Sequence, residues 1–145
     1  MFTEFQRYDF PTLGYIKIPK LDTPGASPEE YLKQLCAEGF EEKLRSGKIK
    51  PEQAEKYSKR TKEELDSIIN LGFAPYILLV KSIPDFAKKN DILMGISRGS
   101  VGGSLVADLI GITKLDPLKH DLLFERFLSA TRAKKKIIDG EEYLD

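Results

Sequence analysis

The most informative segment of this sequence is Gly95-Ile-Ser-Arg-Gly-Ser-Val-Gly-Gly-Ser-Leu-Val-Ala-Asp-Leu-Ile110. Its first ten residues are mostly glycine and serine, and its last six form an apolar run that predicts a helix. The segment begins where Asp91-Ile-Leu-Met-Gly95 predicts a short strand that ends at a glycine. The predicted order is therefore a strand, a glycine–serine turn and the N-terminus of a helix.

This turn has the chemistry of a phosphate site. Glycines let the backbone approach an anion, serine hydroxyls donate hydrogen bonds, and the first N–H groups of a helix lie at the positive end of its dipole. Arg98 would add a bidentate donor for phosphate. Alternatively, Gly102 and Gly103 allow the helix to pack closely on the sheet, and the serines only cap it. The residues leave both interpretations open.

Two common nucleotide-binding motifs are excluded at this turn. No Gly-Lys-Ser/Thr follows it, as a P-loop requires, and Gly99-Ser-Val-Gly-Gly103 does not have the Gly-x-Gly-x-x-Gly spacing of a dinucleotide site. Composition narrows the chemistry further. One cysteine and one histidine exclude an internal disulfide and a cysteine- or histidine-rich metal cluster. Carboxylate or backbone chemistry remains.

Charge and hydropathy predict a neutral, cytoplasmic protein of one domain. The 145 residues include 23 Lys plus Arg and 23 Asp plus Glu, so no overall positive field attracts nucleic acid. The longest apolar run, Ala74–Val80, is far shorter than the ~20 residues of a membrane span. The N-terminus lacks the basic start and apolar core of a signal peptide, and no membrane partner is expected.

Helices are predicted before the turn. Ser27-Pro-Glu-Glu30 is typical of a capping box that opens the first helix, and Cys36 lies in its apolar stripe as a core thiol. A second helix starts near Pro51 and stops at Gly72. Its charged face, which includes Arg60, predicts a solvated surface with i,i+4 ion pairs.

The remaining elements mix strands and helices. Tyr76–Val80 is continuously apolar and predicts a strand covered on both faces, followed by a short helix over Ile83–Asn90. Asp116-Pro117 opens a further helix that runs to Leu128 and contains an exposed His120. The expected fold class is therefore α/β (α+β), with a small sheet flanked by helices.

Six segments of this chain, in this order, resemble the palm domain of the C family of bacterial replicative DNA polymerases. This family includes the alpha subunit of DNA polymerase III. The resemblance implies a nucleotidyltransferase-like palm and a role in DNA replication. The segments are Pro28–Gly39, Glu64–Ala74, Ser97–Ala107, Gly111–Thr113, Asp116–Leu118 and Leu122–Leu128.

The resemblance also implies a nucleotide site. In this family the Gly-Ser element holds the triphosphate of the incoming deoxynucleotide, and the arginine of Phe-Glu-Arg-Phe faces the same triphosphate. These roles fall on Gly99, Ser100 and Arg126, beside Arg98. Backbone N–H groups and an arginine can stabilise a transferring phosphoryl group whose oxygens Mg²⁺ bridges.

The chain departs from the family where catalytic carboxylates are expected. The family reaches Pro-Asp-x-Asp soon after the segment that ends at Arg132, whereas here Ala133-Lys-Lys-Lys-Ile-Ile-Asp-Gly-Glu-Glu-Tyr-Leu-Asp145 follows. No catalytic residue and no metal ligand is therefore assigned, and Mg²⁺ is expected only in the complete polymerase. Residues 137–144 predict a hairpin with an Asp139-Gly140 turn. An acidic metal cluster there, of Asp139, Glu141, Glu142 and Asp145, is disfavoured.

These features divide the chain into three parts: an extended lead-in (1–26), a partial palm (27–132) and a hairpin insertion at a truncated end (133–145). The expected partners are a deoxynucleoside triphosphate, the remainder of a polymerase and, through missing domains, primer-template DNA. The chain alone is expected to be inactive.

Two alternatives remain. One is a polymerase-derived module for protein interaction or inhibition without catalysis. The other is an unrelated nucleotidyltransferase that uses Asp108 or Asp139 as metal ligands, because Asp108 stands where the family often has an aromatic residue.

Overall fold

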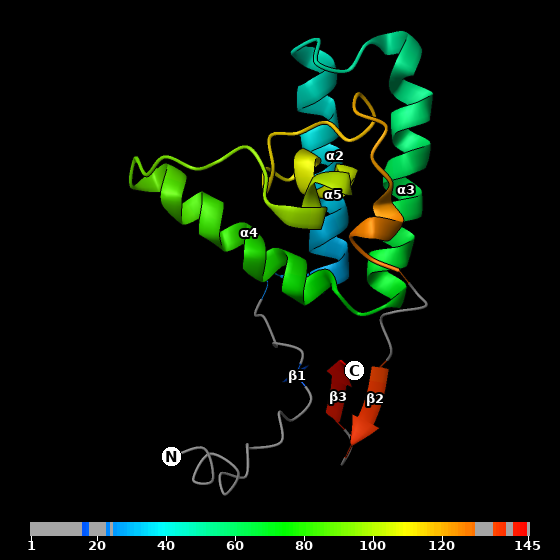
Figure 1. The fold of residues 1–145 in the computed structure, drawn as a ribbon, viewed down its shortest axis with the longest axis vertical. Coiled ribbons are helices and arrows are strands. Elements are labelled where there is room, and N and C mark those ends of the chain that lie inside the picture. Colours follow the sequence, from blue (N-terminus) through cyan, green and yellow to red (C-terminus); the bar gives the residue numbers. More distant parts are fainter. Residues whose placement is uncertain (1–15, 18–22, 24, 130–134, 139–140, 145) are drawn as a thin grey trace, which may run out of the picture.

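The computed structural model describes residues 16–17, 23, 25–129, 135–138 and 141–144 (Figure 1). In chain order its elements are β1 (Ile16–Lys17), α2 (Pro28–Arg45), the 3-10 helix η1 (Pro51–Gln53), α3 (Ala54–Asn70), α4 (Ala74–Lys89), η2 (Gly99–Gly103), α5 (Leu105–Leu109), η3 (Phe124–Arg126), β2 (Lys135–Ile138) and β3 (Glu141–Leu144).

Local signals place α2 and α3 as predicted. The Ser27 hydroxyl accepts a hydrogen bond from the Glu30 N–H at 3.2 Å, and Glu30 accepts one from the Ser27 N–H at 3.3 Å. This capping box opens α2, with Pro28 in the first turn. The next helix, α3, follows the Pro51 turn and ends before Gly72, whose φ of 71° suits the residue after a helix.

The predicted fold class is wrong, because residues 25–129 contain helices, turns and loops but no strand. Tyr76–Val80, expected as a strand, lies inside α4. The short helix expected over Ile83–Asn90 is the second half of the same helix, which contains Pro84 in its interior. A continuous apolar run suits a helix whose one face is buried as well as it suits a covered strand. Here the segment is helical, and its Ile77 and Leu78 are buried in the core.

Asp91–Gly95 is not a strand either. The chain turns at Asp91, which has a φ of 53°. A backbone hydrogen bond to a distant segment joins the Lys114 N–H to the carbonyl of Ile96, just after this stretch, at 2.7 Å. A strand needs a ladder of such bonds with a neighbour. The helix expected from Asp116 to Leu128 is also interrupted: Asp116 caps a turn, Asp121 has a φ of 49°, and only η3 follows.

The described strands lie at the two ends of the chain and do not form a sheet flanked by the helices. They pair antiparallel in the order β1-β3-β2, with Ile16 opposite Leu144 and Ile138 opposite Glu141. Figure 1 draws them beside one another, below the helices. The expected Asp139-Gly140 turn lies outside the described residues.

The core lies where α5 meets the longer helices. Figure 1 shows α2 and α3 side by side and antiparallel, α4 crossing them, and α5 over α2; α5 contacts both α2 and α3. All five residues of α5 are buried. Gly39 of α2 allows the closest approach, since a Cβ there would lie 2.1 Å from the Leu109 carbonyl oxygen.

The buried core cluster joins the helices to η3. Cys36 within it is 1% exposed, and burial raises the pKa of its thiol to about 12. The prediction that Cys36 is a core thiol is confirmed. The buried members are Leu32, Cys36, Ile68, Ala74, Ile77, Leu78, Val106, Ile110, Phe124 and Leu128.

Among the described helices, no single one is both long and apolar enough to cross a membrane. Pro51–Asn70 and Ala74–Lys89 meet the length and composition test only when taken together, and the pair is bent by 113°.

Candidate functional site

The glycine–serine turn forms η2, which leads directly into α5. Arg98, Gly99 and Ser100 are exposed, whereas Gly102 and Gly103 are buried. Gly99 has a φ of 60°, a left-handed conformation that glycine adopts without strain. The first residues of the turn therefore face solvent, whereas its last two glycines are packed.

Close packing explains Gly102 and Gly103. A Cβ on Gly102 would lie 2.9 Å from the Ser97 hydroxyl oxygen, and one on Gly103 would lie 2.6 Å from the Leu123 carbonyl oxygen. The absence of a side chain at Gly103 lets η2 pack against the backbone that leads into η3. The glycines were predicted to pack a helix on a sheet, but they pack the turn on another loop.

The N-terminus of α5 is not open to an external anion. Glu64 of α3 accepts hydrogen bonds from the Leu105 and Val106 N–H groups, each at 3.0 Å, and from the Ser104 hydroxyl at 2.9 Å. The Ser104 hydroxyl also accepts from the Ala107 N–H at 3.2 Å. The first-turn N–H groups that were predicted to bind a phosphate therefore donate to a carboxylate of the protein itself.

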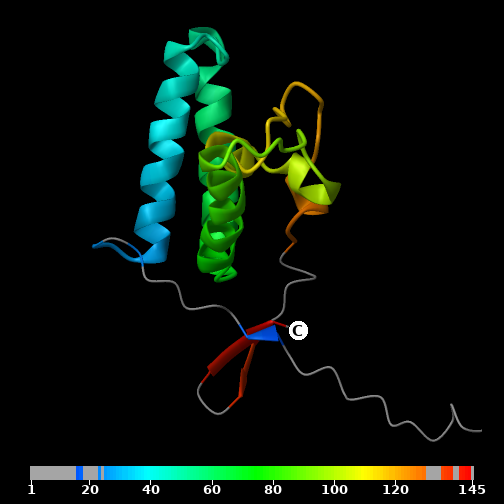
Figure 2. The ribbon, with the colours of Figure 1, turned by 90° about the vertical axis from the view of Figure 1, so that its left-hand side faces the viewer.

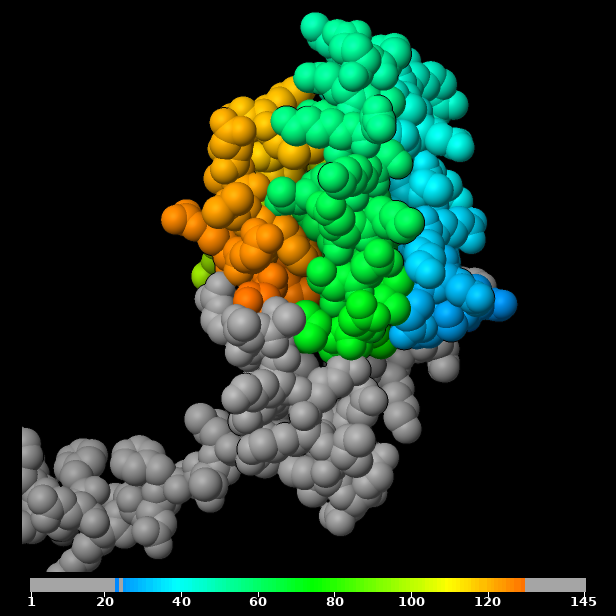
Figure 3. All heavy atoms as spheres, turned by 90° about the vertical axis from the view of Figure 1, so that its right-hand side faces the viewer, coloured from blue at the N-terminus to red at the C-terminus, as the bar shows by residue number. Residues whose placement is uncertain are grey.

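Arg60 extends this arrangement to the next loop. Its Nε donates to Glu64 at 2.7 Å, and its Nη2 donates to the carbonyl oxygens of Gly103 and Leu122, each at 3.2 Å. Figure 3 shows the segment around η3, in orange, packed against α3, in green. The predicted i,i+4 ion pairing on α3 is therefore confirmed for Arg60 and Glu64, but the prediction of a solvated face is wrong at Glu64, which is 1% exposed.

A sequence signal for Glu64 existed. It lies seven residues after Tyr57 and four before Ile68, which are both buried, so helical spacing puts all three on one stripe. A lone acid on an apolar stripe indicates a buried carboxylate that needs partners.

Arg126 lies in η3, and its side chain is exposed. This short helix contacts η2, so the fold brings the two predicted segments together, and their sharing of one anion stays a prediction. His120 is also exposed, as expected. In Figure 2 the segments with η2 and η3 lie to the right of the longer helices.

Asp108 is explained by an ion pair between helices. It is 6% exposed, and its carboxylate lies 2.5 Å from the Lys43 Nζ of α2. Burial raises the pKa of Asp108, and the hydrogen bond and charge of Lys43 oppose that shift.

The described residues contain no group of three His, Cys, Asp or Glu side chains placed to hold a metal. Of the disfavoured acidic cluster, Asp139 and Asp145 and the side chains of Glu141 and Glu142 lie outside what the structure describes. The unrelated-transferase interpretation gains no support from Asp108, whose charge has a partner.

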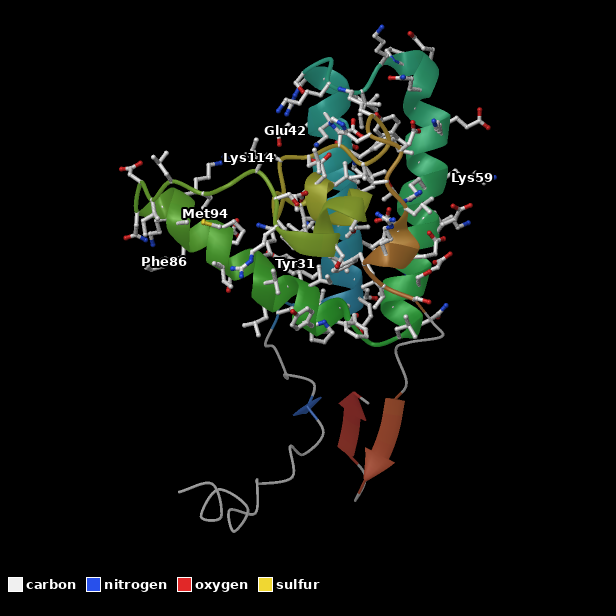
Figure 4. The ribbon with its side chains drawn as sticks, in the orientation of Figure 1. Tyr31, Glu42, Lys59, Phe86, Met94 and Lys114 are labelled. Carbon is white, nitrogen blue, oxygen red and sulfur yellow. The ribbon has the colours of Figure 1, made fainter. Side chains whose placement is uncertain are left out.

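A separate open groove of about 1010 Å³ lies between α2, α4 and the loops that follow α4 and α5. Its lining mixes acids with lysines, and three of the lysines are in ion pairs: Lys43, Lys81 and Lys119. Figure 4 shows Lys114 and Glu42 near its α2 side and Met94 near its α4 side. None of the four predicted site residues lines this groove.

Comparison with known proteins agrees with the resemblance. Residues 30–140 match the family described as the bacterial DNA polymerase III alpha NTPase domain. The DNA polymerase III subunit alpha of Aquifex aeolicus is 46% identical over 123 residues, which are 84% of this chain and 10% of that protein. That of Haemophilus influenzae is 42% identical over 137 residues (92% and 12%), and that of Bacillus subtilis 43% over 129 residues (88% and 11%).

The chain spans about a tenth of the length of these relatives. The match extends over most of the chain, including η2, α5 and η3. The chain therefore belongs to the bacterial DNA polymerase III alpha NTPase domain family.

Proposed function

We propose that this chain is the part of a replicative DNA polymerase that binds the triphosphate of the incoming deoxynucleotide. The observation that carries the proposal is that η2, whose first residues are exposed, contacts η3. The start of η2 supplies the Arg98 guanidinium, the glycine backbone at Gly99 and the Ser100 hydroxyl, and η3, which contacts η2, carries Arg126. Such donors suit the oxygens of a polyphosphate.

The phosphate donors are proposed to be the start of η2 and the two arginines, not the α5 N-terminus. The Leu105 and Val106 N–H groups already donate to Glu64, so an anion would have to displace a buried carboxylate to use them. Arginine can bind two phosphate oxygens at once, and both arginines are exposed.

Mg²⁺ does not fit the described residues as a resident ion. They bring no three His, Cys, Asp or Glu side chains together, so we assign it no ligand in this chain and derive no step through it. The ion would accompany the triphosphate as its counterion. Without assigned catalytic carboxylates, we expect the chain to extend no primer by itself.

The test is titration of the folded chain with a deoxynucleoside triphosphate and Mg²⁺. We expect Arg126→Ala to weaken binding about tenfold or more, because it removes a charge-assisted hydrogen bond, and Ser100→Ala to weaken it severalfold. Lys59→Ala is the matched control, since Lys59 lies on α3 and points away from the body in Figure 4. Equal affinities for Arg126→Ala and Lys59→Ala would contradict the proposal.

A second function, a polymerase-derived interaction module without catalysis, is favoured by one observation. An apolar stripe on α4 is exposed, with Ile83 at 59% and Phe86 at 63%, and Phe86 points away from the other helices in Figure 4. Such patches mark surfaces that other proteins cover. Since the relatives are about ten times longer, the remainder of a polymerase is the proposed occupant. No triphosphate binding in the titration would favour this function.

A further inference from the structure

The Arg60 side chain links two loops that are distant in sequence. One guanidinium nitrogen, Nη2, donates to the Gly103 carbonyl at the end of η2 and to the Leu122 carbonyl just before η3, each at 3.2 Å. The Nε of the same side chain is held at 2.7 Å by Glu64. Glu64 in turn is fixed by the α5 N–H groups, so the guanidinium has little freedom to move.

We infer that Arg60 is a positioning residue that sets the separation between the two loops proposed to bind the triphosphate. One of these loops carries Arg98, Gly99 and Ser100, and the other carries Arg126. This inference rests on the proposed function. It adds a residue whose hydrogen bonds are to the protein itself and to which the resemblance assigns no role.

The geometry requires an arginine at this position. The planar guanidinium has several N–H donors at fixed angles, so it can hold Glu64 and two carbonyls together. A lysine has a single ammonium on a flexible stem and cannot hold all three in one arrangement. The loops also meet directly, because Gly103 leaves no room for a Cβ beside the Leu123 carbonyl. Two contacts therefore set the distance between the loops: the hydrogen bonds of Arg60, which we call the Arg60 clamp, and the close packing of Gly103 on Leu123.

The first test is a double-mutant cycle on triphosphate affinity. Arg60→Lys keeps the charge but loses the clamp, and we expect binding to weaken about tenfold, because small displacements of binding groups are costly. In an Arg126→Ala background the same change should cost less than about twofold, since the group it positions is gone. Lys59→Arg, an exchange at the neighbouring outward position, is the control and should change nothing.

Gly103→Ala is an independent variant that acts on the same spacing while Arg60 is intact. Its methyl group would meet the Leu123 carbonyl at 2.6 Å and push the loops apart. We expect Gly103→Ala to weaken triphosphate binding in the wild-type background and to weaken it less in the Arg126→Ala background. Gly95→Ala is its control, because a Cβ there meets nothing within 4 Å. Circular dichroism establishes that each variant is folded.

Three outcomes of these titrations contradict the inference. The first is an Arg60→Lys affinity equal to that of Lys59→Arg. The second is an equal loss with and without Arg126, which is the behaviour of general destabilisation. The third is a Gly103→Ala affinity equal to that of Gly95→Ala.

A measurement without nucleotide separates this inference from the proposed function. Spin labels on Ser100→Cys and Leu123→Cys, both exposed positions, report the distance between the loops, while Cys36 is 1% exposed and stays unlabelled. We expect Arg60→Lys to broaden the distance distribution. If the chain binds no triphosphate but Arg60→Lys broadens the distance distribution, the proposed function is wrong and the positioning role of Arg60 is supported. An unchanged distribution overturns the clamp.

Discussion

Thr113 is the one described residue with a buried side-chain oxygen that has no hydrogen-bond partner. It is 2% exposed and follows the turn that closes α5. A buried hydroxyl without a partner loses its bonds to water and regains none, which costs about 1–3 kcal/mol.

We expect Thr113→Val to raise the free energy of unfolding by about 1 kcal/mol, because valine has the same shape without the hydroxyl. Urea denaturation measures the change. Thr61→Val is the matched control: its hydroxyl donates to the Tyr57 carbonyl at 2.8 Å, so no gain is expected there. A loss of stability in Thr113→Val would mean that the hydroxyl has a partner in solution.

The short helix α5 depends on α3 more than on its own residues. It has five residues, too few to be stable in isolation, and its N-terminal donors are satisfied by Glu64 and Ser104. Burial of all its residues supplies the remainder of its stability.

We expect Glu64→Gln to lower the free energy of unfolding by about 2–3 kcal/mol, since it removes the charge that four donors share. Its neighbour Glu63 is exposed, so Glu63→Gln should change stability by less than about 0.5 kcal/mol. Chemical denaturation of both variants gives the comparison. Equal midpoints for the two would show that the carboxylate contributes no net stability.

Among the described residues, α4 and the loop after it expose a strongly apolar face. Tyr76, Leu79, Ile83 and Phe86 recur at helical spacing along α4, and Leu93 in the loop is 98% exposed. The opposite face of α4 supplies Ile77 and Leu78 to the core. Both faces of this helix are therefore apolar, which is typical of a helix covered on two sides.

We expect the isolated chain to bind the dye ANS while folded, and Ile83→Ser with Phe86→Ser to remove most of that fluorescence with helicity unchanged. Lys88→Ser, on the same helix, is the control and should leave it unchanged. Undiminished dye binding in the double variant would assign the dye to another surface.

Helix ends were predictable here, and the identity of α4 was not. The Ser27 capping box and the Gly72 stop involve contacts within four residues, so the pattern alone locates them. Tyr76–Val80 is apolar in every position, and such a run satisfies a helix or a covered strand equally. The predicted strand at Asp91 has no ladder partner within the described residues.

The candidate site stays a prediction. Gly99, Ser100 and Arg126 come from the resemblance to the family, and Arg98 comes from the phosphate chemistry of the turn. Arg60 was taken for a solvated residue, because the spacing of charges on a helix does not tell which of them another loop will cover.

Sequence patterns establish the family, the helix caps and the glycine–serine turn, since each depends on residues that are neighbours along the chain. The closure of the α5 N-terminus by Glu64 and the pairing of Lys43 with Asp108 follow from packing, because their partners are 40 to 65 residues apart. Which charge is buried depends on which surfaces meet. Burial then determines which polar groups must pair with one another and which are left to bind a ligand.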